Sequence, residues 1–600
     1  MATPLVRVVF ALLVLVTIGA FFVTQQLKGE FPLVLRFATA PKHFSPNGDG
    51  FRDRTRVGFD LSEPAKISFS VIDGEGNEVR RLVNERELAG DTKHRFSWDG
   101  RDDEGRRVGD GSYRMRVRRR DEGRVIDSIK QIRLDTRPPR VALTSARPGV
   151  ISPGAPGERP QVRIRYRGPR NEAPELRVFR TDGGPPRVVF RLRGDRSRSA
   201  VWDGYVRGRP AAEGNYAFSI TVRDRAGNVA VAPQEIPSPG SARAGTGVAV
   251  RRFTLRGPLG VVAAGSLANL EVGPLDRSLE FALSRLGSRR TSKRGERIGG
   301  RFRVRIPRNA RTGVYVVRVR AGRRRAVWPV AVAGLPPSRR AARRPRPLVV
   351  LPAISWQGEN PIDDDLDGFA NTLASARSVS LERPFAGGRL PPRLRREVAP
   401  FLLFLDRERL AYDLTTDLAL ARGEGPALGN APGVAFPGSA RWLPQPLARR
   451  LRRYVDSGGR VASFGADAFR RTVTLRGGLL LDPSPARPAN AFGERTALLR
   501  TGNAPLLVSE DELGLFEGLT TSIGDFTFFE ESTSLPSGSR KLSSAGREPE
   551  RPAFIAFRLG RGFFVRSGTP QWSRELAESR LSLEVPRVTA RVWRLLRAPR

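Results

Sequence analysis

Hydrophobic and polar residues alternate in short runs over the first half of the chain, after an apolar N-terminal segment. Runs such as RFRVRI (301–306) and YRMRVRRR (113–120) put apolar side chains on one face and mostly arginines on the other. This period of two is typical of β-strands that are buried on one side only. The chain also has 48 prolines and 62 glycines, which indicate many turns between short strands. The pattern therefore predicts a mostly β structure.

One stretch of sequence recurs within this β part. Residues 96–117 (FSWDGRDDEGRRVGDGSYRMRV) correspond to 200–222 (AVWDGYVRGRPAAEGNYAFSITV), and 301–322 form a weaker copy. All three copies have a Gly-x-Tyr strand start, and the first two share a Trp-Asp-Gly turn. Such Trp and Tyr rings can be buried at a module's edge while one polar atom is satisfied. We expect three antiparallel β-sandwich modules in series, at residues 31–136, 137–237 and 238–333.

The period changes after a basic, Pro-rich linker at 334–346. PLVVLPA (347–353) has the composition of a buried strand, residues 391–410 have helical spacing, and 447–469 combine a helix, a Gly-Gly stop and a strand. Strands that alternate with helices are typical of a parallel sheet. We therefore expect one α/β domain at residues 347–600.

The apolar run VVFALLVLVTIGAFFV (8–23) approaches, with its flanking residues, the length of about 20 residues that a membrane-spanning helix needs. Arg7 before the run favours a cytoplasmic N-terminus. A cleaved signal peptide is the alternative, but no small-residue cleavage site follows the run. We expect residues 1–30 to form a single membrane anchor, with the bulk of the chain outside the cytoplasm.

The formal net charge of +43 raises the question of a nucleic-acid partner. The arginines are scattered along every segment and form no nucleic-acid-binding motif, so we expect no nucleic-acid partner. A basic surface also attracts anionic cell-envelope polymers and lipid headgroups. We therefore expect a membrane partner, and as further candidates an anionic envelope polymer or another envelope protein.

The chain contains no cysteine, and its two histidines are His43 and His94 in the first module. Disulfides, thiolate metal sites and cysteine nucleophiles are therefore excluded. A catalytic histidine in the C-terminal part is excluded as well.

The sequence FSPNGDGFRD (44–53), followed by DGEGNEV (73–79) and the Trp-Asp-Gly repeat, resembles the immunoglobulin-like module of bacterial flagellar hook-capping proteins. The resemblance covers about 100 residues, and related modules are common in secreted bacterial surface proteins. It implies an immunoglobulin-like fold for the first module, which the internal repeat extends to the others.

The Asn-Gly-Asp-Gly core of that motif favours a turn with positive φ angles. A calcium loop is the alternative reading, because Asn47, Asp49 and Asp53 could offer oxygen ligands. The twelfth position counted from Ser45 is Arg56, however, where an EF-hand loop has a glutamate.

The C-terminal part resembles the C-terminal domain of the large subunit of N,N-dimethylformamidase and its relatives. This resemblance implies a fold like that of glutamine amidotransferases without their Cys-His machinery, and in the enzyme an iron held by one Tyr and two Glu. The similarity spans most of residues 347–600, and the segments that carry it are 349–361, 400–421, 453–471 and 554–573.

The family's ligand positions are altered in this chain. Glu359 stands in WQGEN (356–360) where the family has its metal-binding Tyr, and Ala440 stands at one Glu; we cannot place the third ligand. Ser463 lies near the amidotransferase nucleophile position but has no histidine to activate it. We expect no catalytic residue and no iron, with Trp356 and Glu359 left as parts of a degenerate cofactor pocket.

A more promising cluster is DDDLDGFAN (363–371). Asp363, Asp365 and Asp367, followed by Gly368, match the first half of a calcium loop, and Asn371 lies beyond them. The stretch also resembles the Asp-rich calcium repeats of thrombospondin-like proteins. The twelfth position is Ala374 rather than glutamate, so a solvated acidic turn stays as the alternative.

These observations predict a membrane-anchored, extracytoplasmic surface protein of the bacterial cell envelope. In this hypothesis β-sandwich modules form a stalk that presents a non-catalytic, amidotransferase-like binding domain. The alternatives are a metal-dependent amidohydrolase related to N,N-dimethylformamidase, acting on C–N amide bonds, and a purely structural envelope spacer. Calcium is the candidate cofactor.

Overall fold

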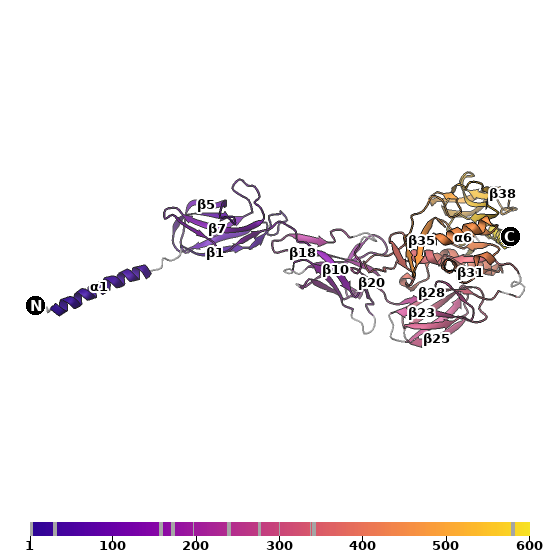
Figure 1. Cartoon of the computed structure of the whole chain (residues 1–600), viewed down its shortest axis with the longest axis horizontal. Coiled ribbons are helices and arrows are strands. Elements are labelled where there is room, and N and C mark those ends of the chain that lie inside the picture. The colour runs from indigo at the N-terminus through magenta and orange to yellow at the C-terminus, as the bar shows by residue number, and fades with distance from the viewer. Residues whose placement is uncertain are drawn as a thin grey trace.

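An N-terminal helix, three β-sandwiches and a C-terminal domain follow one another along the chain (Figure 1). Most of the regular structure is β-strand, which confirms the predicted apolar helix and mostly β chain. The computed structural model describes residues 4–27, 33–154, 160–169, 174–195, 197–236, 242–273, 278–298, 300–336, 338, 344–497, 499–577 and 583–599. The linker expected at 334–346 lies partly outside these residues.

Helix α1 (Pro4–Leu27) extends away from the rest of the chain (Figure 1). Its segment Pro4–Thr24 is long and apolar enough to cross a membrane, and a signal sequence would have the same properties. The hydroxyl of Thr17 donates to the carbonyl of Leu13 at 2.7 Å. This bond satisfies the hydroxyl within the helix, as an apolar surrounding requires.

The first sandwich packs a three-stranded sheet against a larger one. The sheets have the orders β1-β3-β6 and β2-β9-β7-β4-β5, and β8 also pairs with β7. The strands are β1 (Val34–Ala40), β2 (His43–Phe44), β3 (Thr55–Leu61), β4 (Ala65–Ile72), β5 (Glu78–Leu88), β6 (Lys93–Trp98), β7 (Gly111–Arg119), β8 (Arg124–Asp127) and β9 (Ile132–Leu134).

The second sandwich repeats this order as β10-β12-β15 and β11-β20-β18-β13-β14, with β19 on β18. Its last strand, β20, lies beyond the boundary we expect at residue 237. The strands are β10 (Ala142–Arg147), β11 (Val150–Ile151), β12 (Val162–Arg167), β13 (Glu175–Arg180), β14 (Arg187–Arg193), β15 (Ser199–Trp202), β18 (Gly214–Arg223), β19 (Val229–Ala232) and β20 (Val248–Val250), with a small hairpin of β16 (Tyr205–Val206) and β17 (Arg209–Pro210).

The third sandwich has the same two sheets again, β21-β23-β26 and β22-β28-β27-β24-β25. In every sandwich the second strand pairs in parallel with the last one, whereas we expect purely antiparallel sheets. The short second strand has crossed to the opposite sheet, where it runs in the same direction as its neighbour. The strands are β21 (Thr254–Arg256), β22 (Val261–Ala263), β23 (Leu267–Gly273), β24 (Ser278–Arg285), β25 (Lys293–Ile298), β26 (Arg301–Arg305), β27 (Gly313–Ala321) and β28 (Arg324–Ala333).

Repeated aromatic residues fix the same corner in each sandwich. The hydroxyls of Tyr113, Tyr216 and Tyr315 each donate to the carbonyl four residues earlier, at 2.6, 2.7 and 3.2 Å. The indole nitrogens of Trp98 and Trp202 each donate at 3.0 Å to the carbonyl three residues later. Both rings are buried, which agrees with a packing role for the repeat.

The C-terminal domain is built on a nine-stranded sheet of order β31-β29-β32-β34-β43-β42-β41-β38-β39. The first five strands are parallel and the remaining pairs are antiparallel. In this order the strands are β31 (Asp413–Thr416), β29 (Leu348–Leu351), β32 (Val434–Phe436), β34 (Arg460–Ser463), β43 (Gly562–Arg566), β42 (Pro552–Leu559), β41 (Arg540–Gly546), β38 (Arg500–Asp511) and β39 (Ser522–Phe529).

Helices and two smaller sheets surround this sheet. The predicted helix, Gly-Gly stop and strand are present as α6, Gly458-Gly459 and β34. The helices are α3 (Ala353–Gly358), η1 (Ala386–Gly388), η2 (Leu394–Val398), α4 (Ala399–Arg407), α5 (Asp417–Arg422), η3 (Leu428–Asn430), α6 (Gln445–Asp456), α7 (Trp572–Ala577) and α8 (Glu584–Arg597). The smaller sheets are β30-β36-β35-β33 (Ser378–Ser380, Leu479–Leu481, Arg471–Arg476, Trp442–Pro444) and β37-β40 (Arg495–Thr496, Ser532–Ser534).

The third sandwich lies alongside the C-terminal domain rather than in line with the other two (Figure 1). Buried residues of both form one continuous hydrophobic cluster, whereas the first two sandwiches have cores of their own. The ring of Trp328 on β28 stacks on Phe385 of the C-terminal domain at 4.7 Å between centroids. Arg285 and Asp406 add an ion pair of 2.5 Å. Two sandwiches therefore have separate cores, whereas the third shares its core with the C-terminal domain.

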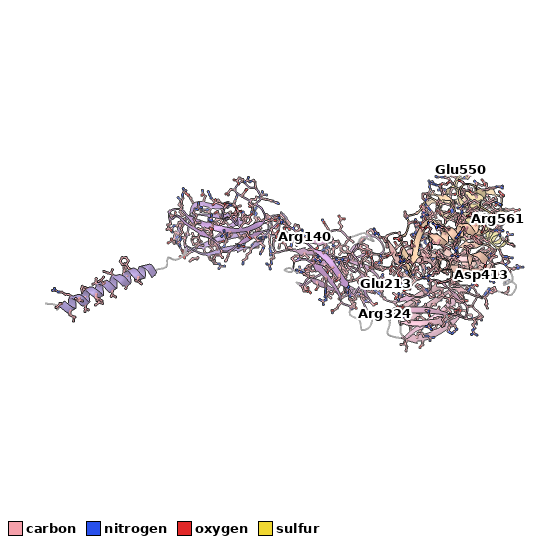
Figure 2. All side chains as sticks on the ribbon, viewed as in Figure 1. Arg140, Glu213, Arg324, Asp413, Glu550 and Arg561 are labelled. Atoms are coloured by element: carbon pink, nitrogen blue, oxygen red, sulfur yellow. The ribbon has the colours of Figure 1, made fainter. Side chains whose placement is uncertain are left out.

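The first two sandwiches meet end to end, near Arg140 in Figure 2. The guanidinium of Arg223 lies 4.3 Å from the ring of Phe51, and the hydroxyl of Ser45 donates to Asn228 Oδ1 at 2.6 Å. The Asn-Gly-Asp-Gly motif thus belongs to the joint between two modules.

Candidate functional site

The carboxyl ends of the parallel strands lead into a cavity of about 580 Å³ in the C-terminal domain. This edge is where open α/β sheets usually bind their ligands. Four arginines line the cavity together with two carboxylates, and the carboxylates of Glu359 and Glu397 pair with two of these arginines. The charged lining residues are Arg393, Arg441, Arg470, Arg471, Asp467 and Glu530.

Glu359, at the C-terminal end of α3, is clamped by two of these arginines. Its Oε2 accepts from Nε of Arg393 at 2.5 Å and its Oε1 from Nη1 of Arg441 at 2.8 Å. Both carboxylate oxygens are therefore used in charge-assisted hydrogen bonds. Glu359, which the resemblance places at the metal-binding Tyr, thus forms ion pairs with two arginines.

Glu397 extends this network towards the end of β32. Its Oε1 accepts from Arg393 at 2.6 Å and its Oε2 from the backbone N–H of Ser439 at 2.7 Å. The neighbouring Ala440 is fully buried. A methyl group thus occupies the position at which the resemblance implies a glutamate ligand.

Asp467, in the turn after β34, accepts hydrogen bonds from two arginines of the cavity. Its Oδ2 accepts from Nε of Arg441 at 2.7 Å and from Nη1 of Arg471 at 2.5 Å. The backbone N–H of Asp467 donates to Glu530 at 2.7 Å. Burial raises the pKa of the Glu530 carboxyl, and the nearby Arg566 guanidinium opposes that shift.

The residues present do not fit the iron site that the family implies. Glu359 offers no free oxygen, Ala440 offers none, and the two histidines lie in the first sandwich. Ser463 is buried and its hydroxyl has no hydrogen-bond partner among the described residues. Trp356 is also buried and belongs to the hydrophobic core, so it packs the base of this region rather than exposing its ring.

The acidic loop has a compact, internally bonded geometry. Asp363, Asp365 and Asp367 each place a carboxylate oxygen within 4.8 Å of the others, as a metal site requires. Asp363 accepts from the backbone N–H groups of Asp367 and Gly368 at 3.2 and 2.8 Å. The three aspartates that the sequence pattern singles out therefore lie close together in the structure.

Burial changes the protonation of this loop. Desolvation raises the pKa of Asp363 to about 8 and that of Asp367 to about 6, and neighbouring carboxylates add to both shifts. Asn371 closes the loop, because its Oδ1 accepts from the backbone N–H of Asp364 at 2.5 Å. Its side-chain oxygen is therefore already used for structure.

The Asn-Gly-Asp-Gly loop of the first sandwich has the bonding of a turn. The two Asp53 oxygens accept from the N–H groups of Gly48 and Gly50 at 2.7 and 2.8 Å, and Asn47 Oδ1 accepts from Asp49 at 3.0 Å. Both glycines have positive φ angles, 84° and 81°. The loop satisfies its own oxygens, which favours the turn over the calcium loop.

The arginines of the cavity are the residues that sequence reasoning missed. They come from separate segments, before η2, before β33 and at the start of β35, and each resembles the many exposed arginines of this chain. One signal was available, because Arg441 directly precedes Trp442 within the family motif. The two guanidiniums of Arg441 and Arg471 lie 5.0 and 5.4 Å from the Trp442 ring.

Among solved structures, similarities are distant. A β-galactosidase from Bacillus circulans sp. alkalophilus is 14% identical, with 39% of this chain and 30% of that chain covered and a TM-score of 0.25. An exo-β-1,4-mannosidase from Opitutaceae bacterium strain TAV5 is 13% identical, with 44% and 38% covered and a TM-score of 0.26. A putative ThuA-like protein from Parabacteroides merdae is 13% identical, with 37% and 78% covered and a TM-score of 0.21. The chain covers less than half of the two glycosidases, and we draw nothing from these similarities.

Family models give a clearer result, although a search of curated proteins finds no match. Residues 47–123 match the FlgD Ig-like domain, and residues 300–495 match the C-terminal region described as N,N-dimethylformamidase beta subunit-like. The second match begins directly before β26, within the third sandwich, which agrees with the core that this sandwich shares with the C-terminal domain. The chain is thus similar to two families in turn, which confirms both resemblances found in its sequence.

Proposed function

We propose that this protein is a single-pass membrane protein of the bacterial cell envelope whose C-terminal domain binds an anionic ligand without hydrolysing it. Helix α1 anchors the chain, with its bulk outside the cytoplasm. The first two sandwiches are the stalk, and the third sandwich and the C-terminal domain are the binding head. The five parallel strands with their helices support an amidotransferase-like fold for that domain.

The observation that carries this proposal is the clamp on Glu359. Two guanidinium groups hold both of its oxygens, at the position that the resemblance assigns to a metal-binding Tyr. Hydrolysis of an amide needs an activated water or nucleophile, which here would require a metal or a base paired with a nucleophile. The described residues of this cavity provide arginines and paired carboxylates instead.

The cavity favours a ligand that carries carboxylate or phosphate groups. Each guanidinium has five N–H donors in a planar fork that matches such anions. The ion pairs of Arg393 and Arg471 engage only some of these donors. An acidic polymer of the cell envelope offers the required groups repeatedly, and the basic surface of the chain attracts it from a distance.

A binding experiment tests the ligand class. Full-length protein in detergent is titrated calorimetrically with a uronic-acid oligosaccharide, a phosphate-bearing oligosaccharide and a neutral oligosaccharide of the same length. Arg471→Gln should weaken binding of the acidic probe on the order of tenfold, the equivalent of about 1.4 kcal/mol. Arg476→Gln is the matched control, because Arg476 lies on the same strand, β35, but is exposed and outside the cavity. Equal affinity for the neutral probe would contradict an anion site.

A second experiment tests the absence of hydrolysis. Full-length protein is incubated with ferrous or ferric iron and assayed for turnover of formamides and short amides. We expect no turnover above that of buffer with iron. Turnover that disappears in Glu359→Ala would restore the amidohydrolase hypothesis.

A further inference from the structure

The acidic loop is also the segment through which the C-terminal domain contacts the second sandwich. The backbone N–H of Gly245 donates to the carbonyl of Asp365 at 2.9 Å, and that of Gly247 donates to Leu366 at 2.7 Å. The hydroxyl of Thr181 donates to the carbonyl of Gly368. The backbone of one loop therefore forms the hydrogen bonds of the joint.

This contact is close-packed on both sides. A Cβ atom on Gly247 would lie 2.0 Å from the backbone nitrogen of Gly368, and one on Gly368 would lie 2.8 Å from the carbonyl oxygen of Tyr216. A Cβ atom on Gly149 would meet the side chain of Leu366 at 2.3 Å. The joint thus depends on the exact shape of residues 365–368, since small shifts of the loop would cause clashes.

Three side chains of the same loop lack a salt-bridge partner among the described residues. None of Asp363, Asp365 and Asp367 forms an ion pair within the part of the chain that the structure describes. Asp367 is 2% exposed, and its Oδ2 has no hydrogen-bond partner there, while its Oδ1 accepts from the backbone N–H of Phe369. A buried carboxylate oxygen without a partner is unfavourable, and a cation would supply the missing contact.

A route from solvent to this cluster exists. Asp363 lines a cavity of about 970 Å³ where the second sandwich, the third sandwich and the C-terminal domain meet. Asp365 is exposed. Glu213, labelled in Figure 2, lies at the end of the second sandwich that faces the C-terminal domain.

We propose that a divalent cation of the calcium type binds between Asp363, Asp365 and Asp367 and thereby fixes the second sandwich against the C-terminal domain. The donor set consists of oxygens, which suits Ca²⁺ rather than zinc or copper. The cation holds the side chains of the loop together, and the loop then presents its carbonyl groups to Gly245 and Gly247 in one arrangement. Without the cation, the three side chains lose their shared partner, and the loop and the joint are held less firmly.

The first experiment measures cation binding to the full-length protein in detergent. Calorimetric titration with CaCl₂ after treatment with a chelator should show one site. Asp365→Asn should weaken it on the order of tenfold or more, because a ligand charge is lost. The side chains that accept from the backbone of this loop are those of Asp363, Asp367 and Asn371, so this change leaves those bonds in place. Glu382→Gln is the control, because exposed Glu382 lines the same cavity outside the cluster.

The second experiment measures the joint itself. The chain has no cysteine, so Arg187→Cys on the second sandwich and Thr474→Cys on the C-terminal domain give a unique pair of spin-label sites, both exposed. Ca²⁺ should narrow the distribution of distances between the labels, and chelator should broaden it. In the Asp365→Asn background, the same Ca²⁺ concentration should leave the distribution broad.

Two outcomes would overturn the proposal. No heat of binding at millimolar Ca²⁺ would remove the site. If Asp365→Asn abolishes Ca²⁺ binding but the parent protein has the same distance distribution with Ca²⁺ and with chelator, the cation does not fix the joint. Neither outcome bears on the arginine-lined cavity, so the proposed anion-binding function is tested separately.

Discussion

At the residue scale, Glu359 stands where the resemblance places the family's metal-binding Tyr. It takes part in an ion-pair network with Arg393 and Arg441, whose side chains are about one quarter exposed. Surface ion pairs contribute little to folding stability, and breaking a fully buried pair costs much of it. The effect of a partly buried pair of this kind lies between the two.

Removal of Glu359 should therefore destabilise the C-terminal domain. We expect Glu359→Ala to lower its free energy of unfolding by about 1–3 kcal/mol, because two guanidinium groups lose their shared carboxylate. Thermal unfolding of the full-length protein measures this change. Glu382→Ala, at an exposed glutamate, should stay within about 0.5 kcal/mol of the parent. A Glu359→Ala variant that is more stable than the parent would show instead that the Glu359 side chain destabilises the folded domain.

Asp417 gives the C-terminal domain a pH dependence. This fully buried carboxyl accepts from the backbone N–H of Ile354 at 3.0 Å, and burial raises its pKa to about 8 from an ordinary value of 3.8. The folded chain thus keeps a proton that the unfolded chain releases between these pH values. Its stability should fall as pH rises from about 4 to 8, by up to about 1.4 kcal/mol per pH unit.

Asp417→Asn should flatten this dependence, since Asn keeps the acceptor oxygen and does not titrate. Unfolding of the full-length protein at pH 5, 6, 7 and 8 measures the slope for both chains. If the slope of the Asn variant equals that of the parent, Asp417 does not keep its proton in the folded state.

Individual site residues were predictable from the sequence only where neighbours in the chain are also neighbours in space. Asp363, Asp365 and Asp367 lie in one loop, so their spacing alone predicts that they meet. Arg393, Arg441 and Arg471 come from three segments, and only the folded sheet brings them to one cavity. Their roles could not be separated from those of the chain's many exposed arginines.

At the scale of elements, the repeat predicted the sandwiches but not how they pack. The first two copies supply Trp98 and Trp202 from equivalent strands. In the third sandwich Trp328 comes from β28 and donates to the carbonyl of Pro258 at 3.0 Å. Because its ring also stacks on Phe385, this element joins two domains that the linker composition seemed to separate.

Substitution of these tryptophans should reveal the cooperative units. Trp98→Ala should destabilise the first sandwich by about 3–5 kcal/mol and leave the rest of the chain unchanged, since its core is separate. Trp328→Ala should destabilise the third sandwich and the C-terminal domain together. Hydrogen exchange on the full-length protein, read by segment, measures both effects. Loss of protection confined to the third sandwich in Trp328→Ala would show that the shared core does not act as one unit.

At the scale of the whole molecule, a single apolar helix precedes a long, jointed body (Figure 1). The described residues contain one helix of spanning length and composition. If α1 is an uncleaved anchor with its N-terminus in the cytoplasm, the head faces outward.

Protease added to intact protoplasts should therefore remove the head, and α1 should stay with the membrane fraction. Antibodies against the two ends of the chain distinguish the fragments. Full protection of the head would contradict the proposed orientation, and release of intact chain into the medium would indicate a cleaved signal sequence.

The two joints on either side of the second sandwich differ in how they would respond to mechanical load. Between the first two sandwiches, side chains form most of the contact, including the Arg223–Asp49 pair of 3.5 Å, which is about one third exposed. Between the second sandwich and the head, backbone hydrogen bonds and glycines without spare room form it. Ionic strength screens the former and barely affects the latter. Bending should therefore concentrate at the joint between the first two sandwiches, and the joint between the second sandwich and the C-terminal domain should bend less.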